Sequence, residues 1–96
     1  MKVTIDYLGS IKQTLSLKQA ENVELKKDAS VLDLLHLLAE KHGGPFKKSV
    51  YEPNDPDLKP YHILSINGLL TNQLNDMETK LKDGDHLVFM PVVSGG

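Results

Sequence analysis

Near its C-terminus the chain runs LKDGDHLVFMPVVSGG, residues 81–96. Asp83-Gly84-Asp85 signals a turn, and the apolar run Leu87-Val88-Phe89-Met90 that follows it predicts a strand. Pro91 has no N–H to donate, so we expect pairing to stop there and the remaining residues to project from the sheet. We therefore divide the chain into a folded domain, residues 1–90, and a C-terminal tail, residues 91–96.

Four other segments are predicted to form the remaining strands of the sheet. Residues 3–7 alternate apolar and polar side chains, which is typical of a half-buried strand, and residues 23–26 repeat the pattern as its hairpin partner. Residues 63–66 predict a further strand that ends at a tight-turn signal, Asn67-Gly68. Residues 69–70 can form a short return strand.

One main helix is expected between these strands. Ser30 can cap its N-terminus and Asp33 suits the first turn, while His42-Gly43-Gly44-Pro45 predicts its end. Its apolar face is made by residues at helical spacing: Val31, Leu34, Leu35 and Leu38. We interpret the proline-rich, acidic residues 44–60 as a long surface connection. The fold class is thus α+β, a mixed sheet of four to five strands with the helix packed across one face.

The overall composition excludes several classes of function. The chain has 96 residues, enough for one domain, and its net charge of −2 offers no basic surface for nucleic acid. It has no apolar stretch of about 20 residues for a membrane span, and charge interrupts the N-terminal segment where a signal peptide would be apolar. It has no cysteine for a disulfide or a thiolate metal site. We expect a cytoplasmic protein.

An active site is not expected within the chain. The four histidines, His36, His42, His62 and His86, lack the usual metal-ligand spacing, and we interpret them as surface or helix-end residues. No serine has a Gly-x-Ser-x-Gly context, and Gly43-Gly44 follows a helix where a phosphate loop would precede one. We therefore expect no catalytic residue, no metal and no bound cofactor.

The C-terminal tail is the candidate functional group. Its last two residues, Gly95 and Gly96, have no Cβ and can enter a channel too narrow for other residues. A carboxylate is a poor electrophile, so Gly96 would need activation, most simply as an acyl-adenylate that a separate enzyme makes from ATP. The activated glycine could then accept sulfur as a thiocarboxylate or an amine as an amide. The residues expected inside the partner's active site are Pro91, Val92, Val93, Ser94 and Gly95.

Several sequence features, taken in order, resemble a known family. They are Lys59-Pro60 before a strand, Ile66-Asn67-Gly68, the segment 81–85 and the ending 90–96. With the helix beginning Ser30-Val31-Leu32-Asp33, they resemble the ubiquitin-like β-grasp sulfur carriers, most closely the small subunit of molybdopterin synthase and the archaeal small modifier proteins. Met90 and Val92 depart from the family ending, in which phenylalanine and proline are common.

The resemblance implies a function through the tail and a ubiquitin-like β-grasp fold. An E1-like adenylating enzyme would activate Gly96 with ATP, and the product would be thiocarboxylated. The tail would then enter the large subunit of molybdopterin synthase and give sulfur to a pterin precursor, or Gly96 would form an isopeptide bond with a lysine of a target protein. In either role the chain is a protein substrate and not itself an enzyme. The alternative is a β-grasp interaction module with a chemically inert tail.

Strand alternation also predicts a docking surface. If the last strand turns Leu87 and Phe89 toward the helix, Val88 and Met90 face outward, and by the same rule Ile63 and Ser65 face outward from their strand. We name Ile63, Val88 and Met90 the outer-face patch and predict that it docks partner proteins beside the tail. The alternative is that these three are scattered surface residues, which are common singly.

Overall fold

The structure is a computed structural model that describes residues 1–92, and its framework is a mixed five-stranded sheet. The sheet order is β2-β1-β5-β3-β4, and only the central β1–β5 pair is parallel. The strands are β1 (Lys2–Tyr7), β2 (Glu21–Glu24), β3 (His62–Ile66), β4 (Leu69–Leu70) and β5 (His86–Pro91). The predicted hairpin, short return strand and mixed sheet are therefore confirmed.

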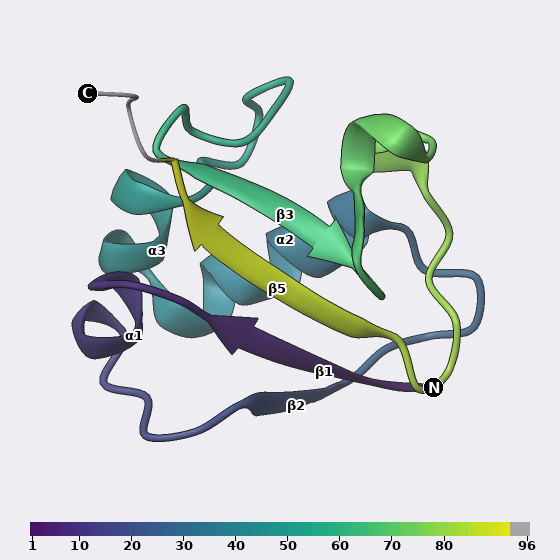
Figure 1. Ribbon diagram of the computed structural model, residues 1–96, viewed down its shortest axis with the longest axis horizontal. Helices are drawn as coiled ribbons and strands as arrows, with labels where there is room; N and C mark the ends of the chain where they lie inside the picture. The colour runs from purple at the N-terminus through teal and green to yellow at the C-terminus, as the bar shows by residue number, and fades with distance from the viewer. Residues whose placement is uncertain (93–96) are drawn as a thin grey trace.

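The helices gather on one face of this sheet. Figure 1 looks onto the opposite face and shows α2 (Val31–His42) crossing behind β5 and β3, with α3 (Gly44–Ser49) beside it. The remaining helical segments are short: α1 (Ile11–Thr14), η1 (Thr71–Gln73) and η2 (Asp76–Glu78). This two-layer arrangement confirms the predicted α+β class.

The main helix begins with the predicted cap. The Ser30 hydroxyl accepts a hydrogen bond from the Asp33 amide at 3.2 Å, and the Asp33 carboxylate accepts one from the Ser30 amide at 2.9 Å. The Ser30 amide lowers the pKa of Asp33, since it stabilises the charged carboxylate. At the other end Gly43 has φ +69°, a conformation that other residues rarely adopt, and the helix stops there.

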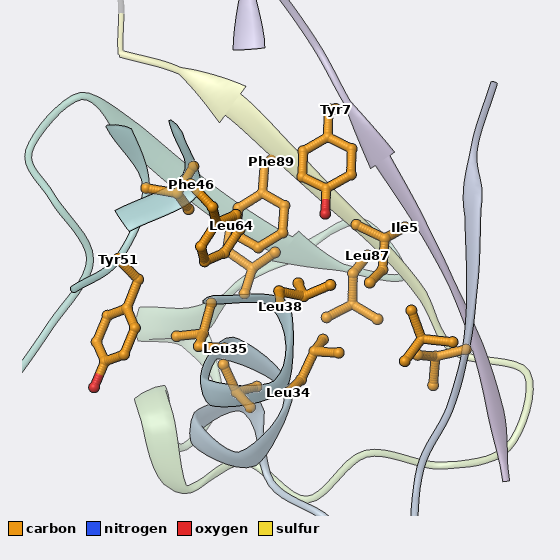
Figure 2. Packing of buried hydrophobic residues seen from close by; sticks show 14 of the residues in the cluster. Ile5, Tyr7, Leu34, Leu35, Leu38, Phe46, Tyr51, Leu64, Leu87 and Phe89 are labelled. Atoms are coloured by element: carbon orange, nitrogen blue, oxygen red, sulfur yellow. The ribbon is translucent and has the colours of Figure 1, made fainter. Parts of the chain in front are cut away.

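Alternation places one face of every long strand in the core. Figure 2 shows Ile5 and Tyr7 of β1, Leu87 and Phe89 of β5 and Leu64 of β3 meeting the leucines of α2. These side chains are essentially inaccessible to solvent, as are Val3, Leu34, Leu35 and Leu38. Their burial confirms the inward faces predicted for the strands and the helix.

The predicted surface connection over residues 44–60 is wrong in its first part. Pro45 lies in the first turn of α3, where its missing N–H costs nothing, and Phe46 of that helix is fully buried. Phe46 packs edge-on against Phe89 with 6.1 Å between ring centroids, and Val50 and Tyr51 are buried as well. Isolated apolar residues in a polar segment show no periodicity, so only the tertiary structure reveals that they belong to the core.

Ser65 lies on the outer face of β3, as predicted, although it is shielded from water. Only 7% of the surface of Ser65 is exposed to solvent. Ser65 lies opposite Leu70 on one side and Val88 on the other, in the interior of the sheet. A small side chain between two larger ones is shielded from water even where no helix lies above it.

Pairing also continues past the predicted end of the last strand. Pro91 belongs to β5 and lies opposite His62, and the Val92 amide donates to the Tyr61 carbonyl at 2.9 Å. Because Val92 and Tyr61 form a hydrogen-bonded pair, the adjacent Pro91–His62 pair is a non-hydrogen-bonded one. The nitrogen of Pro91 thus faces away from β3, and its missing N–H ends only the ladder with β1. The expectation that pairing stops at Pro91 is wrong for the β3 side.

Candidate functional site

The tail continues from a strand in the centre of the sheet. β5 is held between β1 and β3, and the last residue described, Val92, is 47% exposed. The predicted tail residues Val93, Ser94, Gly95 and Gly96 lie outside the described residues, so their roles and the division at residue 90 stay predictions. The position of Pro91 and Val92 shows that the tail continues from a strand with neighbours on both sides.

The outer-face patch is brought together at the same end of the sheet. Ile63 and Met90 lie directly opposite each other in the β3–β5 ladder, and Val88 lies two residues earlier on β5. Ile63 is 41% exposed, and Val88 and Met90 are half-buried. Among residues 1–92 no helix covers this face, which is the one turned toward the reader in Figure 1. The three side chains form a contiguous apolar surface, while their docking role stays a prediction.

Leu8 is a neighbour of this patch that was not predicted from the sequence. The Leu8 amide donates to the Phe89 carbonyl at 2.9 Å, which places Leu8 beside Met90 at the end of β1. Because Tyr7 points inward, alternation turns Leu8 outward, and it is 48% exposed. The signal was present in the sequence, since Leu8 is an apolar residue on the strand face that Thr4 and Asp6 occupy, but only the β1–β5 pairing shows that Leu8 adjoins the patch.

Aromatic rings support the same region from the inner face. Tyr7 and Phe89 are stacked with 5.3 Å between centroids, and both are labelled in Figure 2. His42, at the end of α2, stacks on Phe46 at 6.2 Å and meets Tyr7 edge-on at 6.3 Å. The ends of β1, β5 and α2 are therefore packed together beneath the strand that leads into the tail.

A buried carboxylate joins these ends by hydrogen bonds. Glu21, at the start of β2, accepts from the Tyr7 hydroxyl at 3.0 Å, from His42 Nε2 at 3.0 Å and from the Lys41 ammonium group. Burial tends to raise the pKa of Glu21, but the hydrogen bonds from Lys41, His42 and Tyr7 outweigh it and lower that pKa below its ordinary value. Burial and the adjacent Glu21 carboxylate raise the pKa of Tyr7 well above its ordinary value.

The histidines are more involved in the fold than the sequence indicated. His42 does lie at a helix end, as expected, but its side chain is largely buried against Glu21. His62 contacts the Ser49 carbonyl through Nδ1 at 2.9 Å, and His86 contacts Asp6 through Nε2 at 2.6 Å. Within residues 1–92 no three metal-ligating side chains are gathered at one point, and no helix there is long and apolar enough to span a membrane.

The sequence and the fold of this chain were compared with those of known proteins. Residues 5–96 match the ThiS family. The chain belongs to the ThiS family. This membership makes the protein a ubiquitin-like sulfur carrier and confirms the β-grasp fold expected from the sequence. The match with the ThiS family includes residues 93–96, so it covers the tail.

Solved structures of related size agree with the ThiS assignment. The putative molybdopterin converting factor subunit 1 of Pyrococcus furiosus is 29% identical with a TM-score of 0.75, over 97% of this chain and 99% of that one. A chain in the crystal structure of the BexX/CysO complex of Amycolatopsis orientalis is 28% identical with a TM-score of 0.70, over 98% of this chain and 99% of that one.

A further neighbour supports the fold alone. SAMP1 of Haloferax volcanii is 21% identical with a TM-score of 0.77, over the full length of both chains. A comparison with curated protein sequences gives no match.

Proposed function

We propose that this ThiS-family protein works through the carboxylate of Gly96, which an E1-like adenylating enzyme activates with ATP. The observation that carries the proposal is the family match, which extends to Gly96, together with the end of β5 at Pro91 beside an exposed apolar face. In this proposal the chain is the substrate and carrier, and the adenylating enzyme holds the ATP. The reaction belongs in the cytoplasm, where ATP is supplied.

The chemistry has two balanced steps. A carboxylate oxygen of Gly96 attacks the α-phosphorus of ATP, and pyrophosphate leaves, which gives an acyl-adenylate. A hydrosulfide ion then attacks the acyl carbon, and AMP leaves with the oxygen that joined the two groups. The thioacid formed then loses its sulfur-bound proton, which gives the C-terminal thiocarboxylate. If a lysine amine attacks in place of hydrosulfide, an isopeptide bond forms, and AMP and a proton are released.

The folded part of the chain would supply docking energy for these steps. Ordering the tail in an enzyme channel costs about 1–2 kcal/mol per residue in backbone entropy. Burial of the outer-face patch offsets this at about 25 cal/mol per Å² of apolar surface. The patch lies on the same two strands, β3 and β5, that fix Pro91 and Val92. An enzyme that holds the patch therefore holds the start of the tail in a defined place.

One relative favours sulfur donation to a pterin precursor as the reaction that uses the thiocarboxylate. The Pyrococcus furiosus protein, at 29% identity over almost the full length of both chains, is described as a molybdopterin converting factor subunit. The partner would then be the large subunit of molybdopterin synthase, with this chain as its non-catalytic small subunit. Conjugation to target lysines uses the same activated Gly96 and is the second route within one proposal.

Intact mass spectrometry tests the proposal directly. We would purify the protein from its own cells, with a variant that lacks Gly96 as control. A gain equal to the replacement of one oxygen by sulfur, absent from the control, would establish the carrier role, and tail-dependent adducts of protein size would establish conjugation. If candidate adenylating enzymes and ATP leave the chain unmodified, an interaction module with an inert tail is the better description.

A further inference from the structure

The start of the tail lies close to Gly9, two residues after the end of β1. A Cβ atom placed on Gly9 would lie 3.1 Å from Cγ of Pro91 and 3.5 Å from its Cδ. Carbon atoms pack at about 3.5–4.0 Å, so a side chain at residue 9 would press on the proline ring. The two residues are 82 positions apart in the sequence, and the β1–β5 pairing brings them together.

Gly9 also has a backbone conformation that makes room for the ring. Its φ is +81°, and the chain turns there from β1 into α1, with the Lys12 amide donating to the Gly9 carbonyl at 3.3 Å. Leu8 makes the last β1–β5 ladder bond described in this region, so the backbone leaves β5 where the proline ring begins. Glycine is therefore suited to this position both by its conformation and by its small size.

Pro91 is thus fixed from two sides. On the β3 side, the Val92 amide bonds to the Tyr61 carbonyl at 2.9 Å. On the β1 side, the ring has no N–H for a ladder hydrogen bond, and its Cγ lies only 3.1 Å from the point that a Cβ of residue 9 would occupy. We propose that Gly9 is a positioning residue for the tail: because it has no Cβ, the Pro91 ring can lie close to it, and this close approach sets the point from which the chain leaves the sheet toward the activating enzyme.

This inference rests on the proposed function, because positioning matters only if Gly96 reacts. A small lateral shift of Pro91 would change the place where the tail leaves the sheet relative to the outer-face patch. Docking through that patch would be unchanged, but the reacting carboxylate would be misaligned in the bound complex. We therefore expect a side chain at residue 9 to lower kcat for activation of Gly96 and to change KM for the protein substrate little.

The test compares two asparagine variants that have the same backbone requirement. Asparagine tolerates positive φ better than most residues, so Gly9→Asn adds a side chain with little backbone strain. Gly84→Asn is the matched control, since Gly84 has φ +87° and its added Cβ would meet nothing within 4 Å. With a cognate adenylating enzyme and ATP, we expect Gly9→Asn to lower kcat for Gly96 activation on the order of tenfold, with KM changed less than about twofold. Gly84→Asn should change either constant by less than about twofold.

A double-variant cycle assigns the effect to the proline ring. In a Pro91→Ala background the ring is absent, so Gly9→Asn should then lower kcat by less than about twofold. If Gly9→Asn lowers kcat equally in both backgrounds, or if it behaves like Gly84→Asn, the inference is overturned. Should Gly9→Asn fail to fold, Gly9→Ala is compared with Gly84→Ala: alanine is less suited to positive φ than asparagine, but the two sites share that strain, and only at Gly9 does the added Cβ approach the proline ring.

Hydrogen exchange tests the contact without any enzyme. Displacement of Pro91 should weaken the Val92–Tyr61 hydrogen bond, so the Val92 amide should exchange about fivefold faster in Gly9→Asn than in Gly84→Asn. Equal exchange rates would overturn the contact as a determinant of tail position. If wild-type protein is not activated at all while the exchange rates differ as expected, the proposed function fails and the structural contact stands.

Discussion

At the residue scale, Glu21 is the buried charge that connects the ends of three elements. It accepts hydrogen bonds from Tyr7 of β1 and His42 of α2 while its own backbone starts β2. Glu21→Gln keeps the shape but removes the charge, and we expect it to lower the free energy of unfolding at neutral pH by about 1–3 kcal/mol. Chemical denaturation of both proteins across a pH series measures this difference.

The pH dependence follows from the lowered pKa of Glu21. Because the folded-state pKa lies below the unfolded one, the charged carboxylate stabilises the fold above pH of about 4.3, and this stability is lost as the pH falls through the folded-state pKa. The difference between wild type and Glu21→Gln should therefore shrink in acid. The control is Glu24→Gln on the same strand. The Glu24 carboxylate is exposed and its ion pair with Lys2, at 3.9 Å, is weakened by solvent, so this substitution should change the free energy of unfolding little. A Glu21→Gln difference that stays constant into acid would contradict this account.

At the scale of elements, the cap of α2 decides where the main helix begins. Ser30→Ala removes the hydroxyl that accepts from the Asp33 amide, and we expect it to lower the free energy of unfolding by about 1 kcal/mol. Ser10→Ala is a matched control, because Ser10 precedes α1 and its side chain makes no capping hydrogen bond. Thermal and denaturant unfolding compare the two variants. Equal losses in both would show that the capping bond is not the cause.

At the scale of the whole molecule, the outer-face patch should determine binding to the activating enzyme. Ile63→Asp places a charge opposite Met90 at the centre of the patch, and we expect affinity to fall at least about tenfold. Leu69→Asp is the control, since Leu69 is an apolar residue of similar exposure, 47%, on the edge strand β4 and outside the patch. Titration calorimetry with the adenylating enzyme measures both affinities. Similar losses in the two variants would indicate a general effect of charge and contradict the docking role.

Local patterns in the sequence were sufficient for the strands and the main helix, but not for the shorter helices, and they singled out the candidate reacting group. The alternation of residues 3–7, the cap at Ser30 and the turn at Asn67-Gly68 are each written in a few adjacent residues, and the structure has all three. The Gly95-Gly96 ending, with the other motifs, pointed to the sulfur-carrier family that the match over residues 5–96 shows. These features were predictable because the interactions behind them join residues that are close in sequence.

Tertiary structure alone decided which distant residues meet. Phe46 is in the core because α3 folds back onto Phe89, and Glu21 is charged inside the fold because β2 and the end of α2 are adjacent. Pro91 stays in the sheet because its nitrogen faces β1 while Val92 pairs with Tyr61, and Gly9 meets its ring only through the β1–β5 ladder. None of these pairings leaves a local pattern, since each depends on strand order and on which edge of a strand a backbone group faces.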